Sequence, residues 1–317
     1  MRKSIDILTA VDTCVDILLD CGGEAPRFGQ VEQFIGDYNL NLGGSNGIFA
    51  SGAAKLGLHV AALGAVGNDA FGVYVRDELQ KSGVDIKNLR LDQELKTGVG
   101  FSLCMETGDR AILTYNGSID AVCSGDFTDE LLQKARHLHI GSYYLMHQLR
   151  PAYPNILKKA RKYGVTVSLD TNWDPAEEWD GVADILPMVD VFLPNEKEIL
   201  LLTGNGTVES AAAELCKTIP IVAVKQGANG ASVYAGGQSW TSAPPKTVVR
   251  DTVGAGDCFD AGFIYGYLHG MPLEQCLKIG CLCGSSNTRF PGGTKGQLYK
   301  ADLDILLASS ACSAKTQ

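Results

Sequence analysis

A chain of 317 residues with 45% hydrophobic residues has enough apolar side chains for one large globular core, which excludes extensive disorder. Its net charge of −9 argues against a nucleic-acid partner, because such a partner would need a broad basic face. No apolar run approaches the ~20 residues of a membrane span, and Asp6, Asp12 and Asp16 interrupt the amino-terminal apolar stretch, so we expect a cytoplasmic protein without a signal peptide or membrane partner.

The ten cysteines are scattered along the chain. No two of them have the C-x-x-C spacing that is typical of metal and redox sites, and several lie in apolar runs, where a thiol behaves as a small hydrophobic group. We therefore expect reduced, structural cysteines and neither a disulfide framework nor a metal site built from them.

Short apolar runs alternate with helical patterns along most of the chain, which predicts a single domain over residues 1–317. Such alternation is typical of an α/β fold with a doubly wound, mostly parallel sheet flanked by helices, whose ligands bind near the carboxyl ends of the strands. In chain order, we expect a strand at 5–11, a helix at 45–56, a strand at 60–66, a helix at 73–82, strands at 137–140, 165–169, 191–193 and 221–225 with helical segments between them, helices at 254–269 and 272–287, and a loose tail at 309–317.

Two β-type segments interrupt this rhythm, at about 13–42 and 85–116. The first contains the strand-like piece 31–35, and in the second we expect 97–105 and 110–115 to pair as a hairpin. Together the two segments would form a small sheet that covers the site as a lid. One face and the edges of that sheet would need cover, so we expect a homodimer that pairs through the lid.

The most informative string is Asp-Thr-Val-Gly-Ala-Gly-Asp at 251–257, where a loop enters an apolar helix. Gly254 and Gly256 let a ligand approach the free N–H groups of the first turn, including that of Ala255, so an anion fits there. The carboxylate of Asp257 lies beside this anion site and could accept a proton from a hydroxyl that attacks phosphorus. The string therefore predicts phosphoryl transfer.

Other interpretations of this glycine loop are a capped turn, a dinucleotide site and a P-loop. An acidic residue in a first helical turn is favoured by the helix dipole alone, so a capped turn stays open as an alternative. A dinucleotide fingerprint would need glycine where Phe259 stands, and no G-x-x-x-x-G-K-[ST] string occurs in the chain. A nucleotide would therefore be bound in another way.

Polar residues near the first strand suggest a site for a sugar. Gly43 and Gly44 would let sugar hydroxyls approach the main chain, although tight helix–strand packing would favour glycine equally. Asp16, with Asp12 as the second choice, follows the first strand, and its carboxylate could accept bonds from two hydroxyls. The alternative is a solvated aspartate at the end of a strand.

The strings at 43–44 and 64–72 resemble the amino-terminal signature of the ribokinase-like carbohydrate kinases of the phosphofructokinase-B type. The string at 251–257 resembles their carboxyl-terminal signature. The resemblance covers nearly the whole chain and implies ATP and Mg²⁺ as cofactors. It assigns the catalytic step to Gly254, Ala255, Gly256 and Asp257. It places sugar binding at Asp12, Asp16, Gly43, Gly44, Asn46, Arg110, Asp170, Asn172 and Asp257. It places nucleotide binding at Asn195, Lys225, Gly227, Gly254, Gly256 and Asn287.

Two further segments resemble metal-binding and nucleotide-binding motifs of that family. Asn195 and Glu198 match its N-x-x-E motif, in which the carboxylate holds Mg²⁺ through water. The same spacing is that of a helix capping box, and both interpretations can hold together. Lys225 stands where the family more often has Thr or Ser, and its ammonium could meet a phosphate.

A monovalent-cation loop is the third element that the resemblance suggests. In ribokinase-type members such a loop holds K⁺ mainly through backbone carbonyls. The matching positions here are Asp251, Val253, Ser286 and Arg289. A difference of one residue around Pro291 leaves K⁺ activation open.

The chain also departs from the family pattern. Ile48 stands where an Asn is common, with Asn46 close enough to substitute, and Trp173-Asp174 stands where many members have an Arg. Because that Arg would pair with a substrate carboxylate, its loss argues against a sugar acid. We expect a neutral ketohexose or pentose as the acceptor.

The sequence therefore predicts an ATP-dependent sugar kinase with Asp257 as its base. The nearest alternative is a nucleoside kinase of the same fold, which would stack a base on Phe101, Tyr115, Tyr143 or Trp173. A second alternative is a catalytically inactive sugar-binding regulator, against which the retention of Asp257 and its glycines argues.

Overall fold

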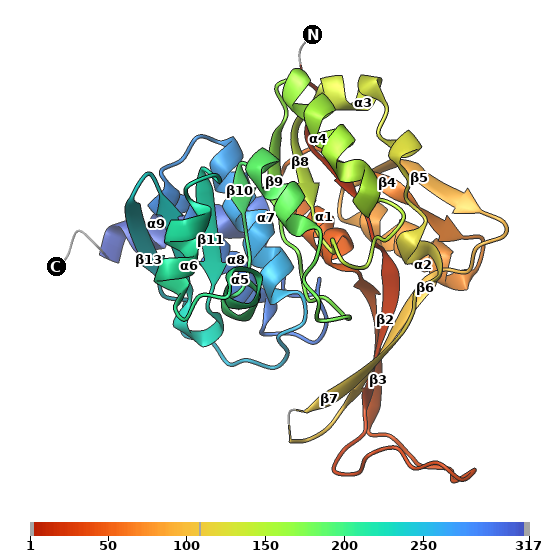
Figure 1. Ribbon diagram of the computed structural model, residues 1–317. Helices are drawn as coiled ribbons and strands as arrows, with labels where there is room; N and C mark the ends of the chain where they lie inside the picture. Colours follow the sequence, from red (N-terminus) through yellow and green to blue (C-terminus); the bar gives the residue numbers. More distant parts are fainter. Residues whose placement is uncertain (1–2, 108, 314–317) are drawn as a thin grey trace.

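The computed structural model describes residues 3–107 and 109–313, and its largest element is a nine-stranded sheet (Figure 1). The spatial order is β13-β12-β11-β10-β9-β8-β1-β4-β5, and all pairs from β11 to β5 are parallel. The doubly wound, mostly parallel sheet that the sequence predicts is thus confirmed. In chain order, its strands are β1 (Ile5–Ala10), β4 (Val60–Gly67), β5 (Asp85–Asp92), β8 (Ala135–Ile140), β9 (Thr166–Leu169), β10 (Val191–Phe192), β11 (Ile221–Lys225), β12 (Ala231–Ala235) and β13 (Gln238–Ser242).

Helices cover both faces of this sheet and create two separate apolar cores. The strands read as continuous apolar runs because both of their faces are covered, and β4 is buried at every position. One core lies between the sheet and α1 (Ser45–Lys55), α2 (Ala70–Lys81), α7 (Ala255–Leu268) and α8 (Leu273–Asn287). The other lies between the sheet and α3 (Asp129–Lys134), α4 (Tyr153–Lys162), α5 (Glu196–Thr203) and α6 (Val208–Leu215).

The order of the strands reverses next to β1. From β1 the chain builds outward through β4 and β5, and it later returns to the other side of β1 with β8. In open α/β sheets, the crevice at the carboxyl ends of the strands beside such a reversal is where ligands bind. The loops that follow β1 and β8 therefore mark the position of the site.

A second, four-stranded sheet extends away from this body (Figure 1). Its order is β3-β2-β6-β7, with the central β2–β6 pair parallel and the two outer pairs antiparallel. We call this sheet the lid. The β6–β7 pairing confirms the predicted hairpin. The strands of the lid are β2 (Cys14–Asp20), β3 (Asp37–Gly43), β6 (Gly98–Cys104) and β7 (Arg110–Tyr115).

Three predicted elements differ from the structure. Residues 31–35 are not a strand, because they lie in an exposed loop between β2 and β3 and pair with no strand of the described chain. Residues 85–92 form β5 of the main sheet, since the burial of Leu89 favours pairing with β4, so the second lid segment begins at Gly98. Residues 309–313 continue helix α9 (Lys300–Ser313) instead of forming a tail, and 314–317 lie outside the described residues.

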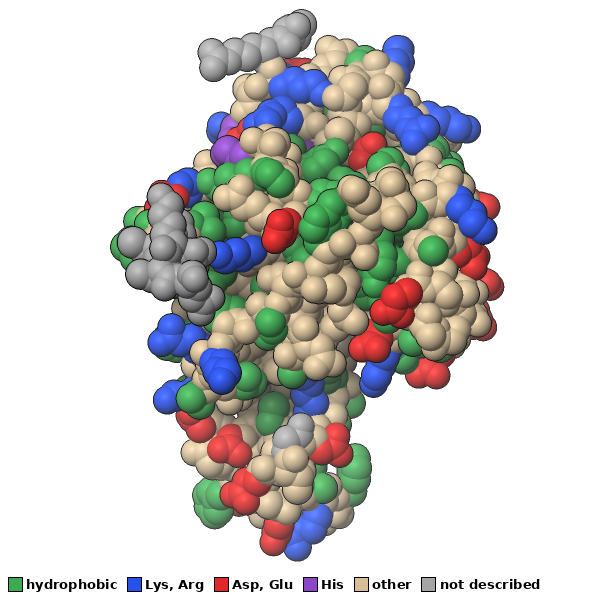
Figure 2. All heavy atoms as spheres, turned by 90° about the vertical axis from the view of Figure 1, so that its left-hand side faces the viewer, with side chains coloured by type: hydrophobic (Ala, Val, Ile, Leu, Met, Phe, Trp, Pro, Cys, Tyr) green, Lys and Arg blue, Asp and Glu red, His purple; other side chains and the backbone are tan. Residues whose placement is uncertain are grey.

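Two surface properties complete the description. Within residues 3–107 and 109–313, no helix has both the length and the apolar character that are needed to cross a bilayer. Figure 2 shows one face of the molecule, on which Lys and Arg side chains occupy several separate places among Asp and Glu. On this face the cations do not gather into one continuous patch.

Candidate active site

Asp12 lies in the loop after β1 and is hydrogen-bonded to the start of α1 and to the loop after β8. Its carboxylate accepts hydrogen bonds from the backbone N–H groups of Ser45, at 3.1 Å, and Asn46, at 2.9 Å, and from the hydroxyl of Ser142. Burial raises the pKa of Asp12, and these three donors oppose the rise. The sequence suggested Asp12 as a sugar ligand, but the structure uses its oxygens to hold the start of α1 against the loop after β8.

The glycine pair at the start of α1 is required by close packing. A Cβ at Gly44, where φ is +84°, would lie 2.3 Å from the carbonyl oxygen of Asp12. A Cβ at Gly43 would lie 2.4 Å from Cγ of Asp16. The tight packing that we considered as the alternative reason for these glycines is therefore present, and it brings both aspartates next to the backbone of the glycines.

Asp16 lies in the lid strand β2 and faces the body of the protein. Its Oδ1 would also be 2.7 Å from a Cβ at Gly100, so the absence of side chains at Gly43 and Gly100 leaves room for the carboxylate. Its hydrogen-bond partner among the described residues is the Cys14 thiol, a weak donor, at 3.5 Å. Burial raises the pKa of Asp16 to about 6. This carboxylate retains most of its capacity to accept hydrogen bonds.

Arg110 of the lid strand β7 reaches across to the loop before α7. Its Nη1 lies 3.9 Å from Oδ1 of Asp251. The Asp251 carboxylate also accepts bonds from the N–H groups of Val253, at 3.0 Å, and Gly292, at 2.8 Å. One carboxylate therefore connects the lid, the loop before α7 and the loop after α8.

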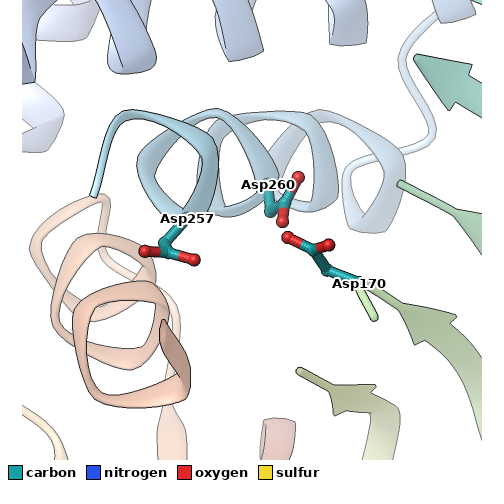
Figure 3. Close-up of side chains that lie close together, drawn as sticks. All are labelled: Asp170, Asp257 and Asp260. Carbon is teal, nitrogen blue, oxygen red and sulfur yellow. The ribbon is translucent and has the colours of Figure 1, made fainter. Parts of the chain in front are cut away.

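The amino-terminal turn of α7 carries the predicted anion site, which stays a prediction. The N–H of Ala255, one of its expected donors, donates to the carbonyl of Thr252 at 3.2 Å. Gly254 caps the helix in the left-handed region, with φ of +71°, and a Cβ there would lie 2.6 Å from Cα of Gly293. Asp257 is buried in the first turn and projects toward α1 (Figure 3). Burial, and then the negative charge of Asp170, raise the pKa of Asp257 to about 8, although Lys225 acts to lower it. The carboxyl group of Asp257 therefore changes its protonation state slightly above neutral pH.

Lys225 lies at the centre of a buried ion cluster under this turn. Its ammonium is 2.6 Å from Oδ2 of Asp170 and 3.2 Å from Oδ2 of Asp260. Asp170 and Asp260 point toward one another in Figure 3. Although burial disfavours the ammonium, these carboxylates raise the pKa of Lys225. The sequence suggested that Lys225 meets a phosphate, but the structure places its charge on two carboxylates.

The sequence analysis missed Asp260, and one signal for it was present. Asp257 and Asp260 are three residues apart in a helix whose neighbours are apolar, so both carboxylates lie on one face. Oxygens of Asp170, Asp257 and Asp260 lie within 4.8 Å of one another, a spacing that could suit a metal ion. The ammonium of Lys225, however, already bonds to two of these three groups.

Asn195 and Glu198 form the capping box that was one of their two interpretations. The N–H of Asn195 donates to Glu198 Oε2 at 2.8 Å, and the N–H of Glu198 donates to Asn195 Oδ1 at 2.9 Å. An isolated parallel β-bridge pairs the backbone of Asn195 with that of Lys225, which brings Asn195 next to the ion cluster. Burial and the charge of Asp170 raise the pKa of Glu198 to about 7. The Mg²⁺ interpretation stays a prediction, and oxygen donors of this kind suit that ion.

A largely apolar cavity of about 700 Å³ opens beside the first turn of α7. Its walls come from the loop after β11, the segment that joins β13 to α7, the start of α7 and the end of α8. A cavity of this size suits a nucleotide. Of the predicted nucleotide-binding residues, it contains Lys225, Gly227 and Gly256.

Hydrogen bonds within the protein occupy part of the predicted K⁺ loop, and Asn287 makes one of them. Nδ2 of Asn287 donates to the carbonyl of Val253 at 2.8 Å, and the N–H of Arg289 donates to the carbonyl of Ser286 at 3.3 Å. Two carbonyls that were predicted to face K⁺ thus have protein donors. Oδ1 of Asn287 is buried and has no hydrogen-bond partner within the described ranges.

Asn46 and Asn172, two predicted sugar ligands, stabilise the scaffold of the site. Asn46 donates to the carbonyl of Gly141 at 3.0 Å, and Asn172 accepts from the N–H of Ser142 at 2.6 Å. Ser142 and Asn172 have φ of +49° and +55°, which is uncommon for residues other than glycine. Backbone strain of this kind clusters at functional sites. No sequence pattern indicated Ser142, because its partners Asp12 and Asn172 lie far away in the chain.

Known proteins are similar to this chain in sequence and in fold. Residues 10–297 match the model of the pfkB family of carbohydrate kinases. An uncharacterized sugar kinase of Archaeoglobus fulgidus is 33% identical over 72% of this chain and 91% of its own, and the 2-dehydro-3-deoxygluconokinase of Bacillus subtilis is 30% identical over 87% and 89%. The fold is similar to that of Arabidopsis thaliana ribokinase complexed with ribose and ATP, with a TM-score of 0.82, 23% identity, and coverage of 97% and 99%.

Proposed function

This chain belongs to the pfkB family of carbohydrate kinases, and from that premise we propose that it transfers the γ-phosphoryl group of ATP to a hydroxyl of a ketohexose or pentose. The observation that supports this reaction best is the position of Asp257. Its buried carboxyl group lies in the same helical turn as the N–H groups of Gly256 and Asp257, whereas the N–H of Ala255 donates to the carbonyl of Thr252 at 3.2 Å. Acceptor hydroxyl and phosphoryl group can meet there.

In the proposed reaction, the deprotonated Asp257 accepts the proton of the attacking hydroxyl. The N–H groups of Gly256 and Asp257 face the phosphoryl oxygens and stabilise the charge that develops on them, and the N–H of Ala255 joins them once it leaves the carbonyl of Thr252. The Lys225 ammonium, fixed by Asp170 and Asp260, favours the charged form of Asp257. Glu198 and Asn195 would hold Mg²⁺ through water, and this ion would supply positive charge to the phosphates of ATP.

The acceptor would lie between the lid and the turn of α7, with Asp16 accepting bonds from its hydroxyls. We propose a neutral sugar because Trp173 and Asp174 stand where many members of the family have an Arg. Asp174 accepts three backbone N–H bonds, from Ala176, Glu178 and Trp179. The name of the Bacillus subtilis relative makes 2-dehydro-3-deoxygluconate the sugar acid to compare first.

The proposed nucleoside stacking residues do not gather at this site. Phe101 and Tyr115 lie on the face of the lid opposite to Asp16, because Gly100 is the residue that pairs with Asp16 and successive strand residues alternate. Tyr143 is buried and stacks on Tyr153. Trp173 is 44% exposed and packs edge-on to Trp179. These positions favour a sugar over a nucleoside.

A homodimer through the lid is part of this proposal. The lid face opposite to Asp16 carries exposed apolar side chains, among them Tyr38, Phe101, Leu113 and Tyr115. A second copy of the same face would cover them.

We propose in addition that K⁺ binds near the carbonyl of Asp251. Binding there requires that the hydrogen bond between Asn287 and the carbonyl of Val253 rearranges.

Release of ADP with a panel of acceptors tests the proposed function. The panel contains fructose, ribose, 2-dehydro-3-deoxygluconate and adenosine, each with ATP and Mg²⁺. We expect turnover with a ketose or pentose and little with adenosine. Higher kcat/KM for adenosine would contradict the sugar assignment, and higher kcat/KM for the sugar acid would contradict the neutral acceptor.

A further inference from the structure

Asn41 of the lid strand β3 is a buried polar side chain to which the reaction above gives no role. It is 2% exposed, and neither its Oδ1 nor its Nδ2 has a hydrogen-bond partner among residues 3–107 and 109–313. Burying an amide without partners is unfavourable, because its bonds to water are lost and nothing replaces them. The side chain is therefore a candidate for binding something that enters the site.

The position of Asn41 is beside Asp16. The two residues are direct partners in the antiparallel pair of β2 and β3, two strands that lie side by side in Figure 1. Their side chains therefore lie on the same face of the lid. Gly43, which makes room for the Asp16 carboxylate, is two residues further along β3 and lies on this face too. Asn41 thus belongs to the face that meets the acceptor.

The loop after α8 packs against Asn41 but forms no hydrogen bond with its side-chain amide. A Cβ at Gly292 would lie 2.4 Å from Cγ of Asn41, so only glycine permits this approach. The N–H of Gly292 donates to Asp251 at 2.8 Å. By contrast, the neighbouring Asn39 is half-buried, and its Oδ1 accepts from Lys295 at 3.1 Å. The loop therefore provides a bond for Asn39 but leaves both polar atoms of Asn41 for a ligand.

We propose that Asn41 binds the acceptor directly and determines its specificity, an inference that rests on the proposed function. The Asp16 carboxylate can only accept hydrogen bonds, whereas the Asn41 amide both donates and accepts. Two such groups side by side match two neighbouring hydroxyls of a polyol, one held by Asp16 and the next by Asn41. The acceptor class is then a sugar with adjacent hydroxyls, and removal of the hydroxyl at Asn41 weakens binding.

Asn41→Leu tests this proposal, with Asn39→Leu as the matched control on the same face. The acceptor is the sugar of the panel above with the highest kcat/KM for the unaltered protein, together with its monodeoxy analogues. We expect Asn41→Leu to raise the KM of that sugar about tenfold or more, with the KM of ATP changed less than about twofold. One deoxy analogue should be a poor acceptor for the unaltered protein and lose nothing further in Asn41→Leu. Asn39→Leu should leave these constants unchanged.

Stability distinguishes acceptor binding from a structural role. Without ligand, Asn41→Leu should melt at the same temperature as the unaltered protein or higher, because an apolar group replaces an unpartnered amide. A lower melting temperature with an unchanged sugar KM would overturn the inference and assign Asn41 to the scaffold. Unchanged kinetics in an active protein would overturn it as well. Failure of the unaltered protein to turn over every acceptor would instead contradict the proposed function on which the inference rests.

Discussion

The body and the lid supply different halves of the proposed site, and they differ in how their charged and acceptor-binding groups are paired, although Oδ1 of Asn287 in the body also lacks a partner within the described residues. In the body, Lys225 is bonded to Asp170 and Asp260, and Glu198 is bonded to Asn195. In the lid, Asp16 has one weak donor and Asn41 has none within the described residues. Under the proposed function, the half for phosphoryl transfer is built before ligands bind, whereas the half for the acceptor is completed by the acceptor.

The physical reason lies in the packing around each half. Two apolar cores hold the strands and helices of the body, and their burial makes unpaired charges costly, so the charges pair with each other. The lid is a single sheet with one exposed apolar face, so less packing holds its residues, and we propose that they move toward the body when a ligand offers bonds. Preorganised groups suit the step in which charge develops, and mobile groups suit recognition and exclusion of water.

Asp257→Asn should have the largest effect, because it removes the base from the preorganised half. We expect kcat to fall by roughly 10²–10⁴, with binding of an ATP analogue preserved. Turnover measured as ADP release checks this, with Asp77→Asn on the exposed surface of α2 as the control. A kcat near that of the unaltered protein would remove Asp257 from its role.

Lys225→Met should show that the preorganised half depends on internal pairing. It leaves two buried carboxylates without their cation, and breaking a buried pair in this way costs about 3–5 kcal/mol of unfolding free energy. Denaturant unfolding at pH 7 measures the loss. Conversion of Asp170 and Asp260 to Asn in the Lys225→Met background should recover part of it, and failure to recover any would show that the pairing contributes little.

The pH dependence of kcat/KM should reflect the raised pKa of Asp257, about 8. The base must be deprotonated, so activity rises about tenfold per pH unit below that pKa and levels off above it. Stability has the opposite sign, since the folded state binds a proton that the unfolded state releases near pH 4, and this contribution is lost as pH rises toward 8. A flat kcat/KM profile from pH 6 to 9 would contradict the assignment.

The sequence predicted the local parts of the site well and the composite parts poorly. The turn at 251–257 could be predicted because its glycines, its N–H groups and Asp257 are neighbours in the chain. Asn41 could not, because its environment comes from Gly292 on another element. The spacing of Asp260 from Asp257 indicated a shared helix face, but the pairing of Asp260 with Lys225 could not be predicted, because Lys225 lies on another strand. In the fold, β5 was assigned to the lid because its polar side chains obscured its one buried residue, Leu89, on the strand that pairs with β4.

Asp16→Asn should have a smaller effect that is confined to the lid half. Replacing one acceptor oxygen with a donor weakens bonds to sugar hydroxyls, and we expect the KM of the acceptor to rise about tenfold. The KM of ATP should change less than about twofold. Initial rates with each substrate varied in turn check the split, and an equal rise in both constants would mean that Asp16 supports the whole site.

Hydrogen exchange tests the difference between the two halves most directly. The protein is saturated with a non-hydrolysable ATP analogue and compared with and without the acceptor sugar that gives the highest kcat/KM. We predict that the acceptor increases protection in Cys14–Asp20, Asp37–Gly43, Gly98–Cys104 and Arg110–Tyr115, while Ile221–Lys225 and the first turn of α7 stay unchanged. Unchanged exchange in the lid at saturating acceptor, or a change confined to the body, would contradict an acceptor half that the sugar completes.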